Sequence, residues 1–133
     1  MIQPLFVFGD WGIFILRVVL GLIMITHGWP KIRNLKGTAA WMGQMFKPGL
    51  FWAVVVALTE FVGGIFLVFG FLTQVVSVLV AIQFIVIILK MKLGKGLVDG
   101  YEFDLLILVS ALALFTLGGG IHSIDQYLGV FLY

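Results

Sequence analysis

Seven polar or ionisable side chains lie within or at the ends of long apolar segments, where such residues are costly. A charge at the centre of a membrane span costs roughly 2.5–3.5 kcal/mol on insertion scales, so it needs a partner or a function. Carboxylates, imidazole and amides suit proton transfer and hydrogen bonding to a small ligand. We therefore predict an intramembrane polar site, with no catalytic role assigned to any one residue. Its candidate members are Arg17, His27, Glu60, Gln83, Tyr101, Glu102 and Asp104.

Glu60 is the central member of this set, because it is the only charge in the apolar run 50–69. Arg17 is likewise the only charge in the run 11–29. With a helix rise of 1.5 Å per residue, Arg17 lies about 18 Å and Glu60 about 15 Å from the ends that the connection 30–49 joins. We therefore predict that the two side chains meet, directly or through water. Such a pair either locks two helices together or takes part in function, and the sequence leaves both readings open.

The remaining polar residues form a second layer, nearer the same end of the bundle. At 100° per residue Tyr101 and Asp104 share a helix face, whereas Glu102 points about 160° away from Asp104. At most one of the two acids should face the interior, and Asp104 is favoured. The alternative is that both acids complement the positive end of their helix, and that His27 is an interfacial histidine.

Several chemistries lack the residues they need. The chain has no cysteine, which excludes a dithiol site or a thiolate-held metal. The two histidines, His27 and His122, are expected on opposite faces of the membrane, so they cannot share one haem, and a single-histidine haem site has no supporting motif. No cluster has metal-ligand spacing, and Gly118–Gly120 follows a helix instead of opening one. The cofactor is therefore unknown, and no metal is predicted.

The composition shows which elements must position these residues. Of the 133 residues, 62% are hydrophobic and 11% charged, against about 25% charged in soluble domains. We predict an all-α fold, a four-transmembrane-helix bundle forming one integral membrane domain over residues 1–133. The helices are expected at about 11–29, 50–69, 73–89 and 101–117. A short interfacial helix, capped by Thr38 and ending at Phe46, should lie between the first two.

Small residues on these helices predict close packing. The packing glycines are Gly21, Gly28, Gly63 and Gly64. A ridge of Thr73, Ser77 and Ala81 follows on the third helix, and such ridges let membrane helices approach each other. We expect a homodimer through these ridges.

The positive charges predict the orientation in the membrane. The connections between helices 1 and 2 and between helices 3 and 4 hold seven of the eight Lys and Arg residues. The positive-inside rule places both connections in the cytoplasm and both termini outside. We therefore expect a multi-pass protein of the plasma membrane, which in a bacterium is the inner membrane. Basic loops of this kind indicate topology, and no nucleic-acid partner is expected.

Four motifs in order resemble the DoxX family of small four-helix membrane proteins. They are the segments 17–31, 60–73, 100–106 and 119–125. The positions that match the family pattern are Arg17, Gly21, Gly28, Lys31, Glu60, Gly64, Glu102 and Asp104. The family takes its name from membrane subunits of archaeal thiosulfate:quinone oxidoreductases, and other members are similar to partners of oxidative-stress enzymes. The resemblance implies a membrane domain with a polar interior and a link to quinone or redox chemistry, without a set of catalytic residues.

The favoured function is a redox-associated membrane subunit linked to quinone or quinol chemistry. Any enzymatic activity would belong to a quinone-linked oxidoreductase complex, with quinone as the ligand and a redox enzyme subunit and the lipid bilayer as partners. The first alternative is a non-enzymatic membrane scaffold or assembly factor. The second is a small proton-coupled transporter, which is disfavoured because pairing with Arg17 would fix the charge of Glu60.

Overall fold

The computed structural model describes residues 8–131, and these residues form helices and turns with no strand among them. Four helical segments are long and apolar enough to cross a membrane. They are Gly9–Arg33, Gly49–Phe69, Thr73–Lys95 and Leu97–Leu117. Many large apolar side chains on these segments face outward, as expected where lipid is the solvent. The predicted four-transmembrane-helix fold is confirmed.

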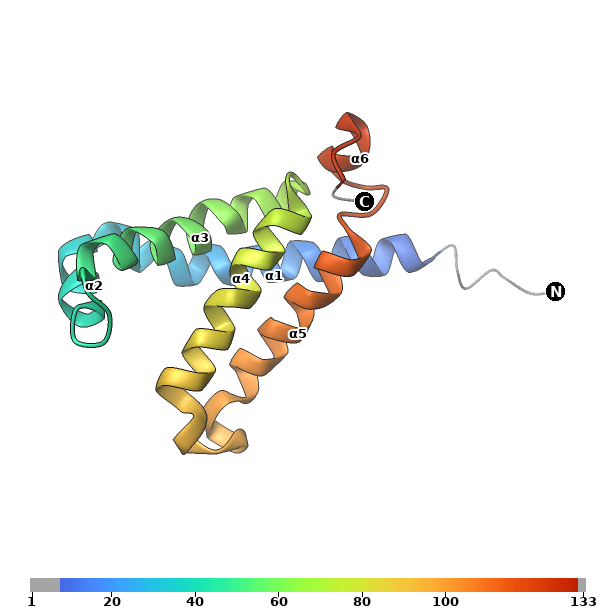
Figure 1. Cartoon of the computed structure of the whole chain (residues 1–133). Helices are drawn as coiled ribbons and strands as arrows, with labels where there is room; N and C mark the ends of the chain where they lie inside the picture. The colour runs from blue at the N-terminus through green and yellow to red at the C-terminus, as the bar shows by residue number, and fades with distance from the viewer. Residues whose placement is uncertain (1–7, 132–133) are drawn as a thin grey trace.

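Six α-helices make up the described chain (Figure 1). They are α1 (Gly9–Arg33), α2 (Leu35–Met42), α3 (Gly49–Phe69), α4 (Thr73–Ile87), α5 (Glu102–Leu117) and α6 (Ile124–Leu128). Irregular helical turns at Ile88–Lys92, Leu93–Lys95 and Leu97–Tyr101 connect α4 to α5. The last helix begins with a side-chain cap, since the Ser123 hydroxyl accepts a hydrogen bond from the Gln126 backbone N–H.

The long helices form two pairs, with α1 packed along α3 and α4 packed along α5. Figure 1 shows that the pairs meet where α3 turns into α4 and diverge toward the opposite end. The short helix α2 folds back beside α3 at that open end. The divergence separates the two pairs on the side where α2 and the α4–α5 connection lie.

Glycines bring α1 and α3 into backbone contact. A Cβ atom on Gly64 would lie 2.7 Å from the carbonyl oxygen of Gly21, and one on Gly28 would lie 2.5 Å from the Phe61 nitrogen. Gly63 instead faces α4, where a Cβ would lie 3.1 Å from Val76. All four predicted packing glycines lie at close contacts between helices, where each position leaves little or no room for a side chain.

Two helices, α1 and α2, differ from the prediction in where they begin or end. The first helix continues through Pro30 to Arg33 instead of ending at residue 29, and the Asn34 N–H bonds to the Pro30 carbonyl oxygen. A proline removes one backbone hydrogen bond, but it leaves later ones intact. The short helix covers Leu35–Met42 and not Thr38–Phe46, because the Asn34 side chain accepts a hydrogen bond from Gly37 N–H and caps it earlier.

The small-residue ridge of α4 lies inside the bundle. Thr73 and Ser77 are fully buried and Ala81 nearly so. The residues therefore serve packing within one chain, and the prediction that this ridge forms a dimer interface is wrong.

Asp125 of α6 stabilises the end of the bundle where α3 turns into α4, called the closed end below. Its two carboxylate oxygens accept hydrogen bonds from the backbone N–H groups of Leu72 (2.6 Å) and Thr73 (2.8 Å). Leu72 has a positive φ of 50°, a conformation that costs a non-glycine residue free energy. The carboxylate thus stabilises a strained turn and places a negative charge at the positive end of α4.

Candidate functional site

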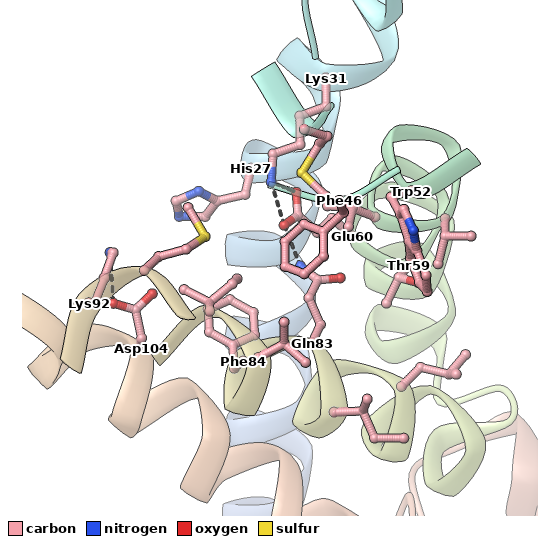
Figure 2. A pocket seen from close by; sticks show the side chains of 18 of the residues that line it. His27, Lys31, Phe46, Trp52, Thr59, Glu60, Gln83, Phe84, Lys92 and Asp104 are labelled. Atoms are coloured by element: carbon pink, nitrogen blue, oxygen red, sulfur yellow. Dashed lines mark hydrogen bonds and ion pairs between the residues drawn. The ribbon is translucent and has the colours of Figure 1, made fainter. Parts of the chain in front are cut away.

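Glu60 is buried in the middle of α3 and is bound by side chains from two other helices. The Lys31 Nζ atom of α1 lies 2.6 Å from each carboxylate oxygen. The Gln83 Nε2 atom of α4 donates to Oε1, also at 2.6 Å. Figure 2 shows the three side chains converging between the helix pairs. This cluster, called the Glu60 cluster below, links α1, α3 and α4 through one carboxylate.

Arg17 lies elsewhere, so the predicted contact between Arg17 and Glu60 is wrong. Its guanidinium donates to the backbone carbonyls of Leu67 (3.0 Å), Val68 (3.1 Å) and His122 (2.7 Å). The error lies in the register, since α1 continues beyond Pro30 and packs with Gly28 beside Glu60. Arg17 therefore satisfies carbonyls at the C-terminal end of α3 and fixes the segment before α6, which is a structural role.

A second ion pair lies across the site. The Lys92 Nζ atom is 2.8 Å from a carboxylate oxygen of the buried Asp104. Glu102 is exposed and accepts a hydrogen bond from the Asp99 N–H at 3.1 Å. The prediction that Asp104 and not Glu102 faces the interior is confirmed. Tyr101 belongs to the irregular turn before α5 and does not share this site with Asp104.

The two ion pairs line one cavity of about 530 Å³ between the diverging helix pairs. It is partly open to the outside and mainly apolar, and elements from α1 to α5 contribute to it. Its aromatic residues are Trp41, Phe46, Trp52, Phe84 and Phe103. Its polar and charged residues are His27, Lys31, Thr59, Glu60, Gln83, Lys92 and Asp104. Four of the seven predicted site residues thus line it, while Arg17, Tyr101 and Glu102 do not.

The two lysines of the cavity were not among the predicted site residues. In the sequence, Lys31 and Lys92 both fall in the basic connections that orient the protein, and Lys31 is otherwise only a position that matches the DoxX pattern. Lys31 follows His27 by four residues and therefore shares its helix face, a spacing visible in the sequence once α1 is known to continue. No comparable signal exists for Lys92, because it reaches Asp104 from an irregular turn.

The charges of the cavity compensate one another. Lys31 pairs with Glu60 and Lys92 with Asp104, so no charged lysine or carboxylate remains to neutralise an ionic ligand. Donors remain, because an ammonium carries three N–H groups and Lys31 uses two on Glu60. Such a cavity suits a neutral ligand with an apolar ring and polar oxygen atoms. Among residues 8–131, no group of three His, Cys, Asp or Glu side chains is placed to hold a metal ion.

Four membrane-spanning helices with buried ion pairs around an apolar cavity define a multi-pass helical membrane protein with an internal site of small-molecule size. The DoxX family matches residues 12–93. The chain belongs to the DoxX family.

Two curated relatives add detail. A Bacillus subtilis (strain 168) protein named "Putative oxidoreductase CatD" is 34% identical over 116 residues, which cover 87% of this chain and 86% of that protein. The Escherichia coli (strain K12) protein named "Inner membrane protein YqjF" is 39% identical over 72 residues, 54% of this chain and 55% of that protein. No solved structure matches the chain.

Proposed function

We propose that this protein is a redox-associated membrane subunit whose cavity binds the ring of a quinone or quinol. The observation that carries the proposal is the Glu60 cluster, a buried and fully paired carboxylate at the wall of an apolar, aromatic-lined cavity. The name of the Bacillus relative, which includes "oxidoreductase", supports the same class. A charge-compensated site favours such a neutral ring over an ionic substrate.

The chemistry of a quinone ring matches the donors of the site. Its two oxygen atoms need a donor on each side, and the remaining N–H groups of Lys31 and Gln83 supply one side. His27 and Lys92, which line other parts of the cavity, supply the other. For a quinol, the carboxylate of Glu60 accepts a hydrogen bond from one hydroxyl group. Interconversion of quinone and quinol would need a redox cofactor of a partner enzyme to exchange the two electrons, and water at the open side of the cavity to exchange the two protons.

The proposal includes the orientation in the plasma membrane, with the two basic connections in the cytoplasm and both termini outside. The cavity then lies nearer the cytoplasmic face, because Lys31 and Lys92 come from those connections.

Binding of a quinone analogue to Glu60→Gln tests the proposal. In its reduced, quinol form the analogue donates a hydroxyl to the Glu60 carboxylate. Loss of a hydrogen bond to a charged group costs about 1.5–3 kcal/mol, so the Kd of the quinol form should rise about 10- to 100-fold. Glu102→Gln is the matched control, because the exposed Glu102 lies outside the cavity, and its Kd should stay at the wild-type value. Equal affinity in wild type and Glu60→Gln would argue against a quinone site. Co-purification of a specific protein partner without quinone binding would favour the scaffold alternative.

A further inference from the structure

A second, smaller hollow adjoins the cavity. It is an apolar groove of about 250 Å³ between α3 and α4, called the α3–α4 groove below. Its lining consists of Leu58, Thr59, Val62, Gly63, Phe66, Leu72, Val75, Val76 and Leu79. Thr59 and Leu79 line both the groove and the cavity. The two hollows therefore meet at one pair of residues, one from each helix.

The groove runs away from the Glu60 cluster toward the closed end of the bundle. Along α3 its lining extends from Leu58 to Phe66, and along α4 from Leu79 back to Val75, with Leu72 in the turn before α4. These stretches correspond to about 10 Å of helix. Gly63 leaves room in its floor, where a side chain would press on Val76. Figure 2 shows Thr59 on the side of the cavity where α3 faces α4.

The outer edge of the groove faces the lipid. Leu58, Val75 and Leu79 are 50%, 40% and 48% exposed, and all three lie on membrane-spanning helices. An apolar chain can therefore enter from the bilayer without crossing a polar surface. A polar ring in the cavity and an apolar chain in the groove would belong to one amphiphilic molecule.

We infer that the α3–α4 groove holds the apolar tail of the ligand, so the substrate class is a long-tailed lipid quinone that enters sideways between α3 and α4. The inference rests on the proposed function for the ring, and it adds the tail and the route. The adjacency of the two hollows, whose linings share Thr59 and Leu79, carries it.

The test measures two probes on the full chain in phosphatidylcholine nanodiscs. The probes are a tail-less dimethoxy-methyl-benzoquinone and its decyl derivative, and quenching of tryptophan fluorescence reports binding because Trp41 and Trp52 line the cavity. The groove is filled by Val75→Phe. The matched control is Val109→Phe, a similarly exposed valine on α5 that does not line the groove.

The expected result is selective. The decyl probe should bind the wild-type protein more tightly than the tail-less probe. Val75→Phe should raise the Kd of the decyl probe about tenfold, a typical effect of overfilling a packed site, and leave the tail-less probe unchanged. Val109→Phe should change neither. Val62→Phe, which fills the groove from α3, should repeat the Val75→Phe result.

Other outcomes separate the two proposals. In one outcome the tail-less probe binds, the decyl probe binds no more tightly, and Val75→Phe does not change the Kd of either probe. The groove then holds something else, such as a phospholipid chain, while the ring site is retained. If both probes weaken equally in Val75→Phe and Val62→Phe, the tail assignment is overturned. If neither probe binds the wild-type protein, the quinone site and the tail groove both fail.

Discussion

Lys31 of α1 places its ammonium group 2.6 Å from both carboxylate oxygens of Glu60 on α3. The carboxylate is almost wholly buried, whereas the lysine side chain remains 26% exposed. The ion pair therefore joins Glu60, which is buried within a membrane-spanning helix, to Lys31, whose side chain still reaches the surface. Removing one partner of a fully buried pair costs roughly 3–5 kcal/mol, because the other charge stays buried.

The first prediction concerns this pair. Lys31→Met should lower the free energy of unfolding by somewhat less than ~3–5 kcal/mol, because Lys31 is partly exposed and Gln83 still donates to Glu60. The double variant Lys31→Met/Glu60→Gln should recover part of that loss, since it leaves no buried charge. Thermal unfolding of the detergent-solubilised protein measures both. Lys36→Met, at an exposed lysine of α2, is the control, and additive losses in the double variant would contradict the pairing.

The second prediction concerns the contact of α1 with α3. Gly64→Ala places a methyl group 2.7 Å from the Gly21 carbonyl oxygen, so the helix backbones must separate. Overpacking typically costs about 1–3 kcal/mol. The control is Gly12→Ala on α1, where nothing lies within 4 Å of an added Cβ. Thermal unfolding in detergent, followed by aggregation, should show a lower midpoint temperature for Gly64→Ala than for the wild-type protein, and an unchanged one for Gly12→Ala. A midpoint equal to that of the control would show that the helices are farther apart.

The third prediction concerns the closed end. Asp125→Ala leaves the N–H groups of Leu72 and Thr73 without their acceptor, at a cost of about 1–3 kcal/mol for each group that stays buried. The segment before α6 should then be cleaved faster by a protease at low concentration. Asp10→Ala, at a partly exposed acid in the first turn of α1, should be cleaved at the wild-type rate. If Asp125→Ala is cleaved at the wild-type rate, the carboxylate of Asp125 does not hold this segment in place.

The fourth prediction concerns orientation. The sequence has no cysteine, so single-cysteine variants give an unambiguous signal. Gly94→Cys in the second basic connection should react with a membrane-impermeant thiol reagent only after cells are opened. Ile121→Cys, which is 55% exposed beside the opposite helix ends, should react in intact cells. The reverse pattern would invert the proposed topology.

The four membrane-spanning helices could be predicted from the sequence, but the register in which α1 packs against α3 could not. Hydropathy predicts four spans because the bilayer demands long apolar helices, and the small residues at Gly21, Gly28 and Gly64 predict close contact. The level of Arg17 relative to Glu60 depends on how far α1 and α3 are shifted along each other, which hydropathy does not determine. Gly28 lies beside Glu60, eleven residues or about 16 Å of helix from Arg17. The four residues by which α1 continues beyond residue 29 account for only about 6 Å of this shift.

Long-range polar contacts were the other part that could not be predicted. The pattern of residues 101–104 correctly separated Asp104 from Glu102, because a helix fixes relative directions within one element. The partner of Asp104 is Lys92, which lies in an irregular turn that has no fixed periodicity. Similarly, Asp125 reaches back to the N–H of Thr73 across 52 positions of the sequence, and no local pattern indicates such a contact.

The glycine contacts of α1 with α3 also have a mechanical consequence. Where two backbones touch, there is no layer of side chains between them that can be compressed or rearranged, so the two helices behave as one stiff wall of the cavity. The opposite wall, α4 with α5, is fastened to α3 at the turn beside Asp125. Any widening of the cavity by that second wall would also have to break the hydrogen bond from Gln83 of α4 to Glu60 of α3.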